Sequence, residues 1–150
     1  MHICKQNKND YILKIFNHIN SFKKGKRNFY SPKGKILIVG ESSVSIKYLE
    51  KSIKELGFAL ERFEFVLDYD DVKRFCYQKV YNNPNYAIIL ASAQPHVSID
   101  TNGYSNTISY ISRTCGYPLL IKLGTNNLKL TKSNLILVLK ILLNIGFLIL

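Results

Sequence analysis

Continuous apolar runs alternate along most of the chain with segments whose apolar residues recur every three or four positions. The runs at 36–39, 86–91 and 119–123 are typical of parallel strands that are buried on both faces. At 60–67 apolar residues alternate with charged ones, which predicts a strand nearer the edge of the sheet. The pattern therefore predicts an α/β fold with a mostly parallel sheet, right-handed crossovers and helices on both faces.

Three helices are predicted between these strands by apolar spacings of three and four residues. The first begins after Gly40, where Ser42 or Ser43 is expected to cap it, and ends with Gly57 as its C′ residue. The second ends at the turn 82–85 and the third at Gly116. Their apolar faces comprise, in order, Ile46, Leu49, Ile53 and Leu56; Val72, Phe75, Cys76 and Val80; and Tyr104, Ile108, Ile111 and Cys115.

An amphipathic helix is predicted at 10–22, outside the regular alternation of strands and helices. Asp10 is the expected N-cap, and the apolar stripe is expected to pack on the sheet or on a partner. The stripe comprises Ile12, Ile15, Phe16, Ile19 and Phe22. We therefore divide the chain into an N-terminal amphipathic helix with a basic linker, 1–34, and an α/β domain, 35–150.

The C-terminal residues 135–150 are almost wholly apolar and allow two interpretations. A membrane anchor is disfavoured because these sixteen residues fall short of the ~20 that a span needs and Lys140 lies near their middle. The favoured interpretation is a buried helix at 131–144, a stop at Gly146 and a final strand at 147–150. Residues 128–130 could add a short strand before that helix.

The expected sheet is Rossmann-like, with the flavodoxin-like strand order 2-1-3-4 and the C-terminal strand outside. In that order the chain reverses direction between the first and third strands, so the loops after these strands form a crevice. The residues expected to bind a ligand there are polar groups and glycines that follow the two strands. They are Gly40, Ser42, Ser43, Ser92, Gln94, Gly103 and Ser105.

Candidate catalytic residues are expected in the same loops. His96 could act as an acid, a base or a phosphate contact, Asp100 could orient it, and Glu41 could serve as a carboxylate catalyst. The motifs GxGxxG, GxxxxGK[ST] and GxSxG do not occur, and no HxxxH or HExxH spacing predicts a metal site. The sequence therefore predicts a site without a reaction: whether the protein is an enzyme, and whether it uses a cofactor, stay open.

The formal net charge of +11 suggests nucleic-acid binding as an alternative function. The basic segment 23–35 carries Phe29 and Tyr30, a mixture that suits single-stranded nucleic acid. Its four leading basic residues are Lys23, Lys24, Lys26 and Arg27. An AT-rich genome would also produce a chain rich in Lys, Asn, Ile and Tyr, so a solvated linker is the simpler interpretation. Three dispersed cysteines and the lack of an export signal indicate a cytoplasmic protein.

Several segments resemble a pattern found in small uncharacterised bacterial proteins with a Rossmann-like α/β fold. These segments are ILIVGES, IILASAQPH, GYSNTISYI, GYPLLIKLG and NNLKLTKSN, within residues 35–145. The resemblance implies a fold and no catalytic activity. Its counterparts in this chain are Pro95, His96, Gly103, Ser105, Asn127, Lys129 and Thr131.

The leading hypothesis from the sequence is a cytoplasmic protein that binds a phosphorylated or nucleotide-like ligand, or another small anion, in the crevice. The first alternative is a nucleic-acid-binding protein that uses the basic segment 23–35. The second is a protein-interaction module without chemistry that docks a partner through 10–22. Homo-oligomer formation stays open.

Overall fold

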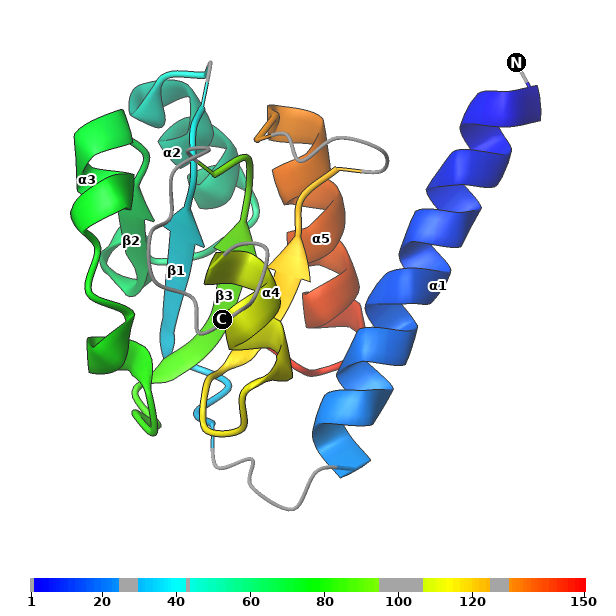
Figure 1. Ribbon diagram of the computed structural model, residues 1–150. Helices are drawn as coiled ribbons and strands as arrows, with labels where there is room; N and C mark the ends of the chain where they lie inside the picture. The colour runs from blue at the N-terminus through cyan, green and yellow to red at the C-terminus, as the bar shows by residue number, and fades with distance from the viewer. Residues whose placement is uncertain (1, 25–29, 43, 95–106, 125–129) are drawn as a thin grey trace.

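The computed structural model describes residues 2–24, 30–42, 44–94, 107–124 and 130–150 (Figure 1). In the first of these segments the side chains are described only for residues 8–22. Its sheet contains β1 (Lys35–Val39), β2 (Phe63–Val66), β3 (Tyr86–Ala91) and β4 (Leu119–Lys122). Within the described residues the sheet has four strands, all parallel, in the order β2-β1-β3-β4. The predicted α/β class is confirmed, and the four described strands lie in the order 2-1-3-4 without the C-terminal strand that was expected outside them.

Helices cover both faces of this sheet because successive side chains of a strand point to opposite sides. Ile36 and Ile38 of β1 belong to one apolar core, which also includes residues of three helices, α1 (His2–Lys24), α2 (Ile46–Glu55) and α5 (Lys132–Asn144). Leu37 and Val39 belong to a second core on the other face, with residues of α3 (Tyr69–Arg74) and α4 (Thr107–Arg113). Two short 3₁₀ helices, η1 (Leu60–Arg62) and η2 (Tyr77–Val80), complete the described elements.

The N-terminal helix is longer than the sequence indicated and packs on the chain's own sheet. Tyr11, Ile15 and Ile19 are buried in the first core, and α1 lies against β4 at the edge of the sheet (Figure 1). Of the predicted apolar stripe, Ile15, Ile19 and Phe22 are therefore used within the chain, whereas Ile12 and Phe16 are only partly buried. Asp10 lies inside α1 and is not its N-cap, because no proline or glycine interrupts residues 2–9 and the helix continues through them.

The start of α2 also differs from the prediction, whereas its end agrees. Ser45 is the N-cap, with its side chain accepting a hydrogen bond from the Tyr48 N–H. Ser42 does not cap the helix: its hydroxyl exchanges two 3.0 Å hydrogen bonds with the backbone of Val44. The N-cap of α2 therefore lies three residues beyond Ser42. Gly57 follows the C-cap with φ +96°, as predicted for a C′ residue.

The predicted helix over Val72 to Val80 is broken into α3 and η2. Phe75 has ψ 127°, which ends the helix, and its ring packs edge-on against Tyr77 at 4.7 Å between centroids. Cys76 and Cys115 were expected on apolar helix faces, but both are exposed free thiols. The reason is that each follows the end of a helix, where the 3.6-residue period no longer applies.

The C-terminus contains the predicted helix but lacks the predicted strand. Thr131 caps α5, and Gly146, with φ +76°, follows its end. Residues 147–150 are not a strand. Phe147 is instead fully buried and stacks on Tyr30 with 4.3 Å between ring centroids, so side-chain packing replaces a ladder of backbone bonds. Of the strand suggested at 128–130, only Leu130 is described, in an isolated parallel bridge with Ser42.

Arg62 fixes the C-terminal segment to the start of the sheet. Its guanidinium donates hydrogen bonds to the carbonyl oxygens of Gly34 (3.1 Å), Pro32 (2.9 Å) and Ile149 (2.5 Å). The Ile149 N–H also donates to the Pro32 carbonyl at 3.0 Å. None of the helices in the described part of the chain has both the length and the apolarity that crossing a bilayer requires.

Candidate functional site

The floor of the predicted crevice is a close contact between the ends of β1 and β3. The Glu41 N–H donates to the Ala93 carbonyl (2.7 Å), and the Ser92 N–H donates to the Val39 carbonyl (2.9 Å). The buried Ser92 hydroxyl donates to the Glu41 carbonyl (2.9 Å). These bonds continue the pairing beyond the strands, so the two loops leave the sheet side by side.

Gln94 extends this floor toward the second face of the sheet. Its Nε2 donates to the carbonyls of Ser92 (2.9 Å) and Val39 (3.3 Å), and its Oε1 lies 3.5 Å from the Tyr77 hydroxyl. Burial raises the pKa of Tyr77, which is therefore a neutral donor at physiological pH. These hydrogen bonds give Ser92 and Gln94 a structural role where the chain reverses direction between β1 and β3. Their contacts with a ligand stay predictions.

Above the floor, the start of α2 meets the start of α5. Ser42 forms its bridge with Leu130, and the Lys132 ammonium lies 5.2 Å from the centroid of the Tyr48 ring. Tyr48 is 52% exposed, and Glu41 is also exposed. Neither α2 nor α5, as described, has an acidic residue in its first turn. The positive ends of the two helix dipoles and the lysine favour an anion at this edge, whereas the carboxylate of Glu41 opposes one.

The structure brings together Gly40, Glu41, Ser92 and Gln94 of the predicted site, with Ser42 beside them. The remaining predicted residues lie outside the described part of the chain: His96, Asp100, Ser43, Gly103 and Ser105. The same holds for Pro95, Asn127, Lys129, Lys26 and Arg27, and for the side chains of Lys23 and Lys24. The catalytic roles and the nucleic-acid alternative therefore stay predictions. Among the described residues, no group of three or more His, Cys, Asp or Glu side chains could hold a metal ion.

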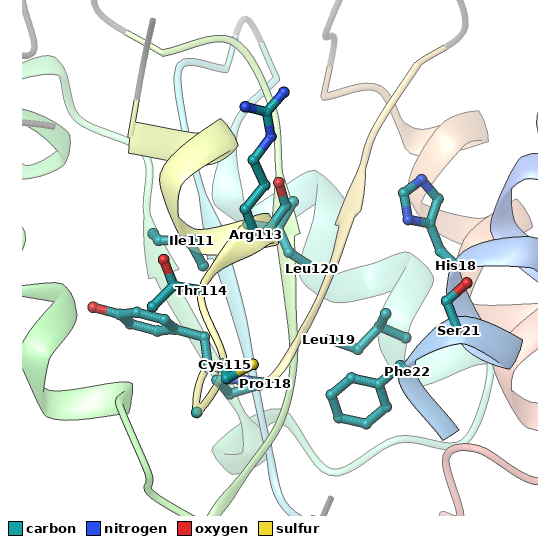
Figure 2. A pocket seen from close by; sticks show the side chains of 13 residues that line it. His18, Ser21, Phe22, Ile111, Arg113, Thr114, Cys115, Pro118, Leu119 and Leu120 are labelled. Atoms are coloured by element: carbon teal, nitrogen blue, oxygen red, sulfur yellow. The ribbon is translucent and has the colours of Figure 1, made fainter. Parts of the chain in front are cut away.

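A second candidate site, which the sequence did not indicate, lies between α1 and the segment from α4 to β4 (Figure 2). Its cavity has a volume of about 340 Å³, within the usual range for small-molecule sites. His18, Ser21 and Phe22 line it from α1. The opposite wall consists of residues 111–120. His18 and Ser21 flank the apolar stripe of α1, but nothing in the sequence shows which surface they face.

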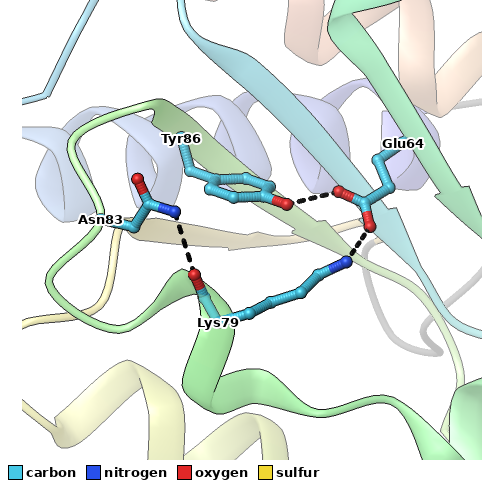
Figure 3. A network of polar contacts seen from close by, with 4 residues as sticks. All are labelled: Glu64, Lys79, Asn83 and Tyr86. Atoms are coloured by element: carbon cyan, nitrogen blue, oxygen red, sulfur yellow. Dashed lines mark hydrogen bonds and ion pairs between the residues drawn. The ribbon is translucent and has the colours of Figure 1, made fainter.

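A polar network beside β2 is structural in character (Figure 3). The Tyr86 hydroxyl donates to Glu64 at 2.6 Å, and the Lys79 ammonium forms an ion pair with the same carboxylate. The Asn83 amide donates to the Lys79 carbonyl at 3.0 Å. Burial by itself raises the pKa of Glu64, but the hydrogen bonds from Lys79 and Tyr86 outweigh it and lower that pKa below its usual value. The network joins η2 to strands β2 and β3.

Comparisons of the chain with models of protein families, with curated proteins and with solved structures find no significant match. The class of the protein therefore rests on its own architecture. It is a small α/β protein with an all-parallel sheet of four described strands and an added N-terminal helix.

Proposed function

We propose that this protein binds a phosphorylated or nucleotide-like ligand at the carboxyl ends of β1 and β3. The observation that carries the proposal is the reversal of the chain at this point. From β1 the chain continues to α2 on one face of the sheet, and the helix that follows β3, α4, packs on the other face. In open parallel sheets ligands bind where the connections diverge in this way.

The chemistry around the crevice supports an anion with an aromatic base. The α2 N-terminus offers N–H groups to a phosphate, and Lys132 adds a positive charge beside it. The exposed ring of Tyr48 provides a face on which a base could stack, and Glu41 could accept hydrogen bonds from a ribose. His96 and Asp100 remain the proposed acid–base pair in the loop after β3.

The topology also supports a Rossmann-like assignment for the fold, as part of the same proposal. The exposed free thiols of Cys76 and Cys115 support a reducing, cytoplasmic location, in which such thiols persist.

Binding of nucleoside mono-, di- and triphosphates and of sugar phosphates, measured by calorimetry and thermal shift, tests the proposal. We expect the double variant Tyr48→Ala/Lys132→Gln to weaken binding about tenfold or more, since base stacking alone is worth roughly 1–3 kcal/mol. His96→Ala should also weaken binding or abolish any turnover.

The matched control uses the same kind of pair on another helix. On α3 the Lys73 ammonium lies 5.3 Å from the centroid of the Tyr69 ring, which is 47% exposed. Tyr69→Ala/Lys73→Gln should leave ligand affinity unchanged. If none of these ligands raises the melting temperature, or if both double variants weaken binding equally, the proposal is wrong.

A further inference from the structure

The cavity beside α1 lies next to the residues that hold this helix against the edge of the sheet. The Tyr11 hydroxyl donates to the Lys122 carbonyl at 2.6 Å, and Ile15 and Ile19 are buried against the core. On the same helix His18, Ser21 and Phe22 line a space of about 340 Å³. The residues that line this cavity include none of those that form the crevice.

One part of the cavity wall is apolar. Leu119 of β4 is buried in the first core, on the same side as Phe22 of α1, which packs against that core. Leu120 and Ile111, which are buried in the second core, line the cavity from the other side of β4. Figure 2 shows Phe22 and Leu119 facing the turn that carries Cys115 and Pro118. The Phe22 ring also packs edge-on against Phe147, with 5.9 Å between centroids. This wall provides a preformed surface for an apolar group, and the fixed aromatic ring favours a planar one.

The rest of the wall is polar and positively charged. Arg113 and His18 line the cavity from opposite sides, and the described residues that line it include no Asp or Glu. Loss of hydration, followed by the charges of Lys122 and Lys14, lowers the pKa of His18. His18 is therefore a neutral donor or acceptor at physiological pH, whereas the guanidinium of Arg113 is positively charged.

We propose that this cavity binds a small aromatic carboxylate, with its ring against Phe22 and Leu119 and its carboxylate toward Arg113 and His18. A guanidinium matches the planar, two-oxygen geometry of a carboxylate. The volume lies at the low end of the range for ligand sites, and the wall is largely apolar, which favours a single aromatic ring with one anionic group. This site shares no residue with the crevice, so either proposal can fail without the other.

Cys115 offers a direct readout of occupancy. It lines the cavity and is exposed, whereas Cys76, which is also exposed, does not line it. The test measures N-ethylmaleimide labelling of each cysteine by peptide mass spectrometry, with phenylacetate as the ligand and neutral phenylacetamide as its matched control. At ten times the Kd of phenylacetate, we expect Cys115 labelling to slow about tenfold, with Cys76 labelling unchanged. Phenylacetamide at the same concentration should protect much less.

Two pairs of variants connect the protection to this cavity. Ser21→Trp should fill the space and remove phenylacetate binding, whereas Asn20→Trp, at an exposed neighbouring position outside the lining, should bind normally. Arg113→Gln should weaken the binding of phenylacetate about tenfold and leave that of phenylacetamide unchanged, because a charge-assisted hydrogen bond is lost. Arg74→Gln, at an exposed position on α3, removes the same charge elsewhere and should have no effect.

Saturable protection of Cys115 that needs both the carboxylate and Arg113 supports the proposal. The proposal is overturned if phenylacetate gives no protection at millimolar concentration, if it slows the labelling of Cys76 equally, or if Ser21→Trp and Asn20→Trp bind it equally well. Nucleotide binding at the crevice is measured on the same samples, so failure at one site is distinguished from failure at the other.

Discussion

A β-carbon on Gly40 would lie 2.3 Å from the hydroxyl oxygen of Ser92, closer than non-bonded atoms approach one another. The backbone of Gly40 also has φ +133°, a region that side-chain-bearing residues rarely adopt. Its N–H donates to the Val66 carbonyl of β2 at 3.0 Å, while the next residue, Glu41, bonds to Ala93 after β3. The end of β1 is thus held between its two neighbours, and only glycine fits there.

Gly40→Ala should therefore be strongly destabilising, by about 3 kcal/mol or more, because the clash involves backbone atoms as well as a buried hydroxyl. Gly146→Ala is the matched control, since Gly146 has φ +76° but a β-carbon added there would meet nothing within 4 Å. Gly146→Ala should lower the free energy of unfolding by about 1 kcal/mol, because it adds only backbone strain. Urea unfolding measures both. Equal losses would show that the contact with Ser92 is unimportant.

Tyr11 connects α1 to the edge of the sheet, and Tyr11→Phe tests that connection. Removing a hydroxyl that bonds to the Lys122 carbonyl should cost about 1 kcal/mol of unfolding free energy. It should also speed amide hydrogen exchange in α1. Tyr48→Phe, at a half-exposed position on α2, should cost much less because water can solvate the hydroxyl there. Two results would contradict this role of Tyr11: an equally large loss of unfolding free energy in Tyr48→Phe, or an unchanged rate of amide hydrogen exchange in α1 of Tyr11→Phe.

The Glu64 network predicts a specific loss of stability in acid. Because folding lowers the pKa of Glu64, its contribution is present at pH values above the unfolded pKa and is lost as the pH falls through the folded one. Glu64→Gln should therefore be less stable than the native protein at pH 7, by less than about 1 kcal/mol because the pair is partly exposed. Between about pH 5 and pH 3 that difference should shrink.

Urea unfolding at a series of pH values measures this difference. Glu55→Gln, at an exposed position on α2, is the control and should follow the native profile closely. A difference between Glu64→Gln and the native protein that does not change with pH would contradict the assignment.

Local sequence patterns predicted the strands and the ends of the helices well, because the forces that form these elements act between residues close together in the sequence. The runs 36–39 and 86–91 are strands, and Gly57, Gly116 and Gly146 follow helices with φ of +96°, +103° and +76°. A continuous apolar run is shielded from water on both faces when it lies between two covering layers. A glycine in the left-handed region likewise ends a helix without help from distant residues.

Local patterns failed where several neighbouring residues could play the same role, and where packing against a distant segment decided the structure. Ser42, Ser43 and Ser45 can all cap a helix, and the turn from β1 onto the sheet face selected Ser45. Residues 147–150 have the composition of a strand, yet Phe147 packs on Tyr30 and Ile149 bonds to Arg62. Those partners lie far away in the sequence, so no local window could include them.

The sequence by itself determined the α/β class and the glycines and polar groups that follow the strands, because periodicity and turn chemistry are local properties. The tertiary structure decided how these groups are used: Ser92 and Gln94 are bonded into the crevice floor, and Lys132 of α5 lies beside Tyr48 of α2. It also decided that α1 packs on β4 and leaves a cavity at His18 and Phe22. Which surfaces meet depends on packing between elements distant in sequence, and a cavity is a property of that packing alone.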